Sequence, residues 1–149
     1  MNRDKILKII NAVSPVIGIG LMIGYRVCDT SCSSLQGTFL GMDLKMIGIL
    51  YMAVLFMLTL PPASRDATLV NYVRTMMLSG GLGAEVFLVR FQIVHDIYCP
   101  FCLAFGLCVV VLFVANFTKM NRPLVLGAFL AGVATFTLFF KGTVLPFYD

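Results

Sequence analysis

Charged residues are scarce in this chain. Asp, Glu, Lys and Arg make up 12% of its 149 residues, about half of the roughly 25% that is usual in soluble domains. Apolar residues make up 60%, and the mean hydropathy is +0.97. Because the deficit extends over the whole length, the composition excludes an ordinary soluble domain and leaves no room for a separate one. It predicts a single integral membrane domain over residues 1–149.

Two other features are missing. No small-residue cleavage site of the kind that ends a signal peptide precedes Cys28, where the residues are Tyr25, Arg26 and Val27. The first apolar run is therefore expected to remain as a membrane helix. Blocks of basic residues are also missing, and the net charge of +4 is explained by membrane topology. Nucleic acid is therefore not an expected partner.

Five apolar runs are candidates for membrane helices, since crossing about 30 Å of hydrocarbon takes about 20 residues. The second run is short, and the third contains Arg74, Glu85 and Arg90. The fifth is rich in Gly and Ala, which let helices pack closely in lipid. The sequence predicts an all-α membrane protein with helices over about 6–27, 44–60, 69–94, 99–118 and 124–140.

The distribution of Lys and Arg predicts the orientation, because cytoplasmic ends of membrane helices carry more of them. With the N-terminus in the cytoplasm, seven of these residues lie at inner ends and four at outer ends. The inner ends hold Arg3, Lys5, Lys8, Arg65, Arg74, Lys119 and Arg122, and the outer ends hold Arg26, Lys45, Arg90 and Lys141.

Four of the five cysteines then lie at the outer face. Cys28 and Cys32 follow the first helix, and Cys99 and Cys102 open the fourth. Thiols outside the cytosol tend to form disulfides, and four cysteines allow three pairings, among which the sequence does not choose. Cys108 lies in the membrane interior, on another face of the helix from Cys102, and is expected to be an inert, packed thiol.

The sequence C-P-F-C has the form of a helix start. Pro100 suits the first helical position, which makes Cys99 the N-cap and Cys102 the third helical residue, about one turn deeper. Cys99 is then expected to face water and Cys102 to face the bilayer. The positive end of the helix dipole favours thiolate there. The alternative is a static clamp or a pair of inert membrane cysteines.

The sequence C-D-T-S-C can bring Cys28 and Cys32 within disulfide distance if the loop forms a helical turn. Such a bond could simply hold the loop, but an exposed disulfide is also open to attack by an external thiol. Two cysteine pairs on one membrane face suggest a relay. Electrons would enter at the loop pair, pass to the helix pair, and leave to a lipophilic two-electron acceptor, which in a membrane is a quinone.

The stretch CDTSCSSLQGTFLGMDLKMIGILY, followed by YCPFC, resembles the vitamin K epoxide reductase family, and specifically its bacterial members that act like DsbB. The resemblance runs from Cys28 to Cys102, about half of the chain, and the order of helices extends it further. The family pattern has two loop cysteines, a hydroxyl residue six positions later, a Gly-led start of helix two, and C-x-x-C opening helix four. The remaining matching positions are Thr38, Gly41 and Gly48.

The resemblance implies a four-helix bundle around a quinone, ubiquinone or menaquinone, with a fifth helix outside it, in a bacterial inner (plasma) membrane. It implies that Cys32 shuttles between Cys28 and Cys99, that Cys28 faces a separate, extracytoplasmic thioredoxin-like partner, and that Cys102 lies beside the quinone. Contacts with the quinone ring are expected from Thr38, Phe39, Phe101 and Phe105. No fused thioredoxin domain is expected.

The chain departs from the family at three places. Its loop cysteines are closer together than usual, and Thr38 stands where Ser is usual. The Asn and Tyr that vertebrate members use for vitamin K chemistry have their nearest positions here at Leu44 and Gly106. The loss of both polar groups favours plain quinone reduction over epoxide reduction.

Two further groups could move protons. Glu85 is an unusual charge for a membrane helix; it could lie near the interface or belong to a proton route to the quinone. His95, next to Asp96 and about one turn before Cys99, could take protons in thiol exchange or be an ordinary interfacial residue.

The sequence thus predicts a membrane thiol–quinone oxidoreductase that drives disulfide formation. The alternative is a small membrane carrier for a soft cation such as Hg²⁺ or Cu⁺, for which paired cysteines and nine methionines are suitable. A carrier should have cysteines or methionines along its inner path and at its exit, where Cys108 is the one candidate thiol and the cytoplasmic loops have none. A purely structural subunit with two disulfide clamps has no feature in its favour.

Overall fold

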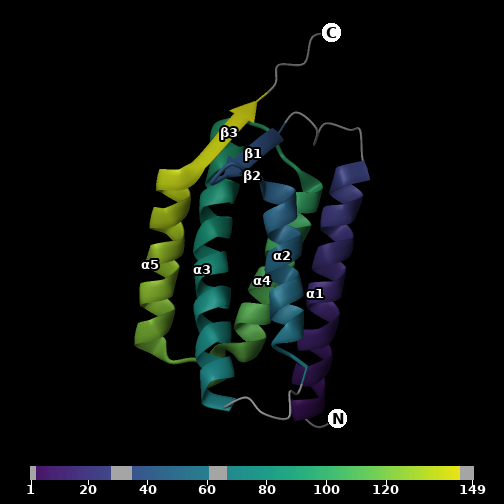
Figure 1. The fold of residues 1–149 in the computed structure, drawn as a ribbon, viewed down its shortest axis with the longest axis vertical. Coiled ribbons are helices and arrows are strands. Elements are labelled where there is room, and N and C mark those ends of the chain that lie inside the picture. Colours follow the sequence, from purple (N-terminus) through teal and green to yellow (C-terminus); the bar gives the residue numbers. More distant parts are fainter. Residues whose placement is uncertain (1–2, 28–34, 61–66, 145–149) are drawn as a thin grey trace.

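The computed structural model describes residues 3–27, 35–60 and 67–144. Within these residues five α-helices run up and down the molecule (Figure 1). They are α1 (Arg3–Val27), α2 (Leu44–Met57), α3 (Ala67–Val94), α4 (Pro100–Asn116), which continues into the 3-10 turn η2 (Phe117–Lys119), and α5 (Arg122–Phe139). The five predicted helices are confirmed, with ends that differ by a few residues.

Four of these helices are long and apolar enough to cross a membrane, and α2 is a shorter apolar helix. At 1.5 Å per residue the 14 residues of α2 extend over about 21 Å. Its last turn would therefore leave backbone carbonyls in apolar surroundings. Arg74 of α3 meets this need, because its Nη2 donates to the carbonyl oxygen of Leu58 at 2.7 Å. This contact accounts for one of the three charges in the third apolar run.

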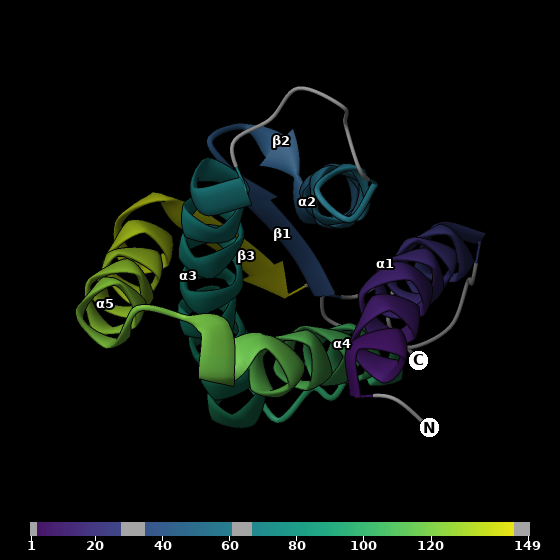
Figure 2. The ribbon, with the colours of Figure 1, turned by 90° about the horizontal axis from the view of Figure 1, so that it is seen from below.

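The helices do not form a closed ring. Seen along their axes, α5, α3, α4 and α1 follow an arc, and α2 stands on the inner side of that arc (Figure 2). α3 packs on α5 and α4, whereas α1 packs on α2 and α4. The expectation of a fifth helix outside four others is met in part, because α5 lies on the flank of α3 but also faces the space between α3 and α2.

Close contact between α3 and α5 depends on glycine. A Cβ atom on Gly132 would collide with the backbone carbonyl of Gly80, and one on Gly83 would collide with that of Phe129. Small residues permit this approach of two backbones, which supplies van der Waals contact between helices in lipid. The expected close packing of the Gly-rich fifth run is confirmed.

A small sheet, not predicted from the sequence, crosses one end of the helices. It consists of β1 (Leu35–Phe39), β2 (Met42–Asp43) and β3 (Phe140–Val144), in the antiparallel order β2-β1-β3. Leu40 and Gly41 join β1 to β2 with φ angles of 52° and 81°, as two-residue hairpin turns require. The all-α assignment is therefore wrong at this end. The strands are short, and β3 continues an apolar run that reads as helix.

A buried pair of amides joins α1 to α4. Asn116 Nδ2 donates to Asn11 Oδ1 at 2.7 Å, and Asn11 Nδ2 donates back to Asn116 Oδ1 at 3.2 Å. Asn116 also donates to the carbonyl oxygen of Leu112, one turn earlier in α4. Both side chains are more than nine-tenths buried, so each amide satisfies the other where water is absent.

We expect Asn116→Leu to lower the free energy of unfolding in detergent by about 1–2 kcal/mol, because Asn11 is left buried without its partner. The double variant Asn11→Leu, Asn116→Leu should lose less than the sum of the single changes. Thr137→Val, at an exposed position of α5, is the control. Strictly additive losses in a thermal or chemical melt would contradict the pairing.

Candidate functional site

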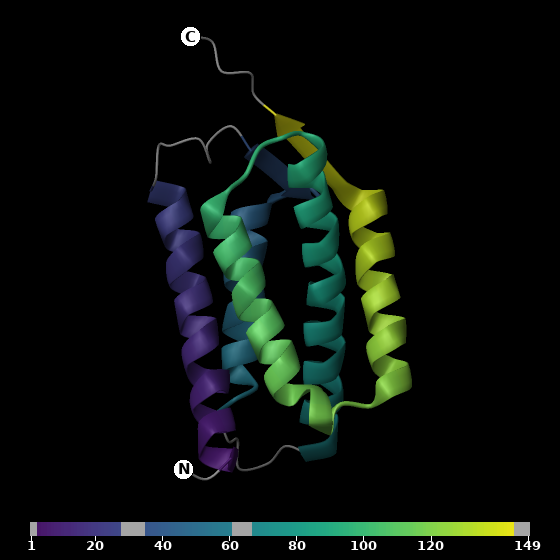
Figure 3. The same cartoon turned by 180° about the vertical axis from the view of Figure 1, so that it is seen from behind.

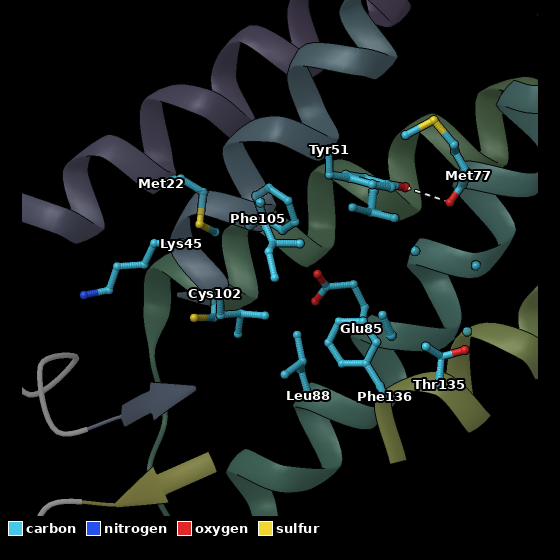
Figure 4. A pocket seen from close by; sticks show the side chains of 18 of the residues that line it. Met22, Lys45, Tyr51, Met77, Glu85, Leu88, Cys102, Phe105, Thr135 and Phe136 are labelled. Carbon is cyan, nitrogen blue, oxygen red and sulfur yellow. Dashed lines mark hydrogen bonds between the residues drawn. The ribbon is translucent and has the colours of Figure 1, made fainter. Parts of the chain in front are cut away.

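A cavity of about 400 Å³ separates α2 from α3 (Figure 4). All five helices contribute to its wall, which is mainly apolar and includes several small residues of α3 and α5. The polar side chains that reach it come from Tyr25, Lys45, Tyr51, Glu85, Cys102 and Thr135. Its volume lies in the range of small-molecule sites, which combine apolar walls with a few polar groups.

The connection from α3 to α4 determines where Cys99 and Cys102 lie. Asp96 adopts a left-handed φ of 51°. The Asp96 N–H donates to the carbonyl oxygen of Ile93 at 3.3 Å, and the Ile97 N–H donates to the carbonyl oxygen of Gln92 at 3.1 Å. This is the hydrogen-bond pattern of a Schellman helix end. It turns the chain so that only five residues lie between the end of α3 and the start of α4.

Cys99 is the N-cap of α4 and Pro100 its first residue, as predicted. The Cys99 N–H donates to the side-chain oxygen of Gln92 at 2.9 Å. Gln92 is 2% exposed and therefore rigidly placed. Its backbone and side chain together hold both sides of the connection, so the start of α4 is held against the end of α3.

The two cysteines of the pair have different surroundings. Cys102 is half-buried and lines the main cavity, as well as a smaller one beneath the sheet that is also bordered by Gly37 and Phe140. Cys99 was expected to face water, but it is 0% exposed and belongs to the apolar core that includes Tyr25. That expectation is corrected. A thiol that attacks Cys99 needs the covering side chains to move first.

Lys45 brings a positive charge to the end of the cavity that holds Cys102. It extends from the first turn of α2, lines both cavities, and places its Nζ 4.4 Å from the centre of the Tyr25 ring. This cation–π contact holds the ammonium group at the cavity rim. The sequence marked Lys45 only as an outer-end charge.

Glu85 lies deeper in the same cavity. Its carboxyl group points into the space beside Phe105, from the middle of α3 (Figure 4). The side chain is 9% exposed. A Cβ atom on Gly106 of α4 would lie 2.7 Å from its Oε2. Of the two expectations for this residue, the structure disfavours a snorkelling position at the interface.

Tyr51 was not singled out from the sequence. Its hydroxyl group donates to the carbonyl oxygen of Met77 at 3.0 Å, which links α2 to α3 across the cavity. The Tyr51 side chain also fits against Gly81, where a Cβ atom would collide with the Tyr51 hydroxyl oxygen. A phenol in the middle of an otherwise apolar helix could have signalled this role, because a buried Tyr hydroxyl needs a partner.

The residues predicted to contact a quinone are dispersed. Phe105 lines the cavity, with its ring centre 6.5 Å from that of Tyr51. Phe101 packs on Tyr25, Phe39 stacks on Phe136 at 4.6 Å, and Thr38 is exposed on β1. None of these three is among the described residues that line either cavity. Binding of quinone by any of the four remains a prediction.

The other predicted residues lie elsewhere. Cys28 and Cys32 are outside the described residues. Cys108 is half-buried and does not line the cavity. His95 is exposed, and its Nδ1 lies 2.9 Å from the carbonyl oxygen of Phe91. Within the described ranges no group of three or more His, Cys, Asp or Glu residues is arranged to hold a metal ion.

Gln92→Ala should increase the alkylation rate of Cys99 in the reduced protein by about fivefold, since the loss of one hydrogen bond amounts to about 1 kcal/mol. Mass spectrometry of the Cys99 peptide over time measures this rate. His95→Ala, which changes an exposed side chain nearby, should leave it unchanged. Equal rates in wild type and Gln92→Ala would show that Gln92 does not hold the start of α4.

Comparisons with family models, with curated proteins and with solved structures give no match to this chain. The resemblance described above therefore depends on the cysteine pattern and on the order of the helices.

Proposed function

We propose that this protein is a membrane thiol–quinone oxidoreductase of the vitamin K epoxide reductase type. It would take electrons from a thioredoxin-like protein and pass them through Cys28 and Cys32, then Cys99 and Cys102, to a quinone. The observation that supports this most strongly is the position of Cys102. It opens a membrane helix and lines an apolar cavity of about 400 Å³.

The cavity suits a quinone ring. Its wall is apolar, with the rings of Phe105 and Tyr51 on it, and it has few polar groups. Such walls accept a flat, uncharged ring, and the few polar groups can orient its two carbonyl oxygens. Lys45 at the rim would offset the negative charge of the Cys102 sulfur whenever that sulfur is a thiolate.

The proposed reaction balances in three exchanges. The partner's dithiol reduces the Cys28–Cys32 disulfide and becomes a disulfide itself. Cys32 then attacks the Cys99–Cys102 disulfide at Cys99, which releases Cys102 as a thiolate. Cys28 next attacks Cys32, which re-forms the Cys28–Cys32 disulfide and releases Cys99, and the protons of the loop thiols pass to Cys99 and Cys102. When Cys99 and Cys102 form their disulfide again, two electrons and two protons leave them. The quinone, when bound, is the acceptor of both and leaves as quinol.

The two ends of the helix bundle agree with the proposed entry of electrons from outside the cytoplasm. The start of α1 and the connection from α4 to α5 lie at one end of the molecule, where Lys119 is 3.9 Å from Asp4. The start of α4, whose N-cap is Cys99, and the sheet lie at the opposite end (Figure 3). With the N-terminus in the cytoplasm of a bacterium, as the basic residues predict, the helix pair would face the oxidising side of the inner membrane.

Reconstitution with a reduced thioredoxin-like protein should give quinone reduction, which is measured as the loss of quinone absorbance. We expect Cys32→Ala and Cys102→Ala each to abolish turnover, because each removes one carrier of electrons. Cys108→Ala, which changes a thiol outside the cavity, is the control and should retain it. Full turnover in both of the first two variants would refute the mechanism. Tight, stoichiometric metal binding without quinone reduction would instead favour the metal carrier.

A larger side chain in the cavity should affect the quinone step alone. Ala84 is 8% exposed and lines the wall on α3. Ala84→Leu should weaken the apparent quinone affinity by at least about fivefold, because overpacking typically costs 1–3 kcal/mol. Electron transfer from the partner to Cys99 and Cys102, measured by thiol trapping, should continue. Ala134→Leu, at an exposed site on α5, is the control, and unchanged affinity in Ala84→Leu would place the quinone elsewhere.

A further inference from the structure

Glu85 is the buried acid that the proposed exchange of electrons does not use. Carboxyl groups are rare in membrane helices because their desolvation is costly, and those that occur are usually paired. Yet within the described ranges Glu85 has neither a hydrogen bond nor an ion pair with another residue. Unlike the Ser79 hydroxyl oxygen, which is fully enclosed and has no hydrogen-bond partner, the carboxyl oxygens of Glu85 are not fully enclosed by protein. The carboxyl group is therefore open to the cavity.

The neighbouring polar groups are already engaged. The Tyr51 hydroxyl group donates to the carbonyl oxygen of Met77, and the Thr135 hydroxyl group donates to that of Ala131. Lys45 lies over the Tyr25 ring at the rim. Both hydroxyl groups have thus used their one donor, and among the described side chains in the deep part of the cavity the protonated Glu85 carboxyl group has a donor left for a ligand.

The position of Glu85 relative to Cys102 follows from Gly106. Residues 102 and 106 are one turn apart in α4 and lie on the same face. Because position 106 has no side chain, Glu85 Oε2 occupies the space where its Cβ atom would stand. The carboxyl group of α3 thus lies against α4, one turn deeper than the thiol, and both groups border one cavity (Figure 4).

We propose that Glu85 donates a proton to a carbonyl oxygen of the quinone; this inference depends on the function proposed above. Electrons would come from the sulfur of Cys102, and the proton from the deeper end of the cavity. The carboxylate left on Glu85 would regain one of the two protons that the thiols of Cys99 and Cys102 release as their disulfide forms, and the other proton would go to the second carbonyl oxygen of the quinone. Two thiols and one quinone then give one disulfide and one quinol, with no proton left over.

Two substitutions separate binding from proton transfer. Glu85→Gln keeps the size and can still donate a hydrogen bond to a carbonyl oxygen, but it cannot transfer a proton. Glu85→Leu removes both abilities. Ser79→Ala is the matched control, because it removes a buried polar group from the same helix outside the cavity.

The experiment measures two quantities on each reconstituted variant. Calorimetric titration with short-chain ubiquinone and menaquinone analogues gives the affinity. Stopped-flow oxidation of the reduced protein by the same analogues, in H₂O and D₂O, gives the rate of quinol formation and its solvent isotope effect. Thermal melts of all variants identify any that have not folded.

We expect Glu85→Gln to bind the analogue within about threefold of wild type but to form quinol about 10²-fold more slowly or worse, as loss of a general acid does. Glu85→Leu should also lose affinity by about tenfold, in keeping with the loss of a hydrogen bond, and Ser79→Ala should match wild type. Wild-type rates in Glu85→Gln would overturn this inference and leave the proposed function standing. Absence of quinol formation by the wild type would overturn both.

Discussion

The hydrogen bond from the Cys99 N–H to Gln92 is the contact on which the geometry of the site depends. It joins the end of α3 to the start of α4 and so determines the turn at which α4 begins. The positions of Cys102 and Gly106 along the cavity follow from that start, since helix geometry leaves no freedom within four residues. A shift of the start by one residue would rotate both away from Glu85 by about 100°.

Three other polar side chains of the helices have structural tasks. Arg74 satisfies the end of α2, and Asn11 and Asn116 join α1 to α4. Each binds a backbone group or another side chain, as groups that have left water must. The cavity residue Glu85 differs from them in having no such protein partner among the described residues, and this contrast assigns it to a ligand rather than to the fold.

The helices could be predicted from the sequence to within a few residues because each is a mainly apolar run, and Pro100 placed the start of α4 to the residue. The sheet could not be predicted, because the paired strands β1 and β3 are about a hundred residues apart in the sequence. Neither strand has a periodic pattern of its own. For the same reason the burial of Cys99 was missed. It depends on Tyr25 and other core residues of distant helices, whereas the local motif indicates only an N-cap.

The sheet has one further consequence. β2 leads into α2, β3 follows α5, and Gly37 and Phe140 of the sheet border the smaller cavity near Cys102. Strand residues thus form part of the wall at that end, whereas the main cavity is lined by helices alone. A quinone that acts as proposed would then arrive sideways between helices, from lipid. Its relevant concentration is then the mole fraction in the bilayer, and saturation would depend on the ratio of quinone to lipid rather than on the amount per volume of buffer.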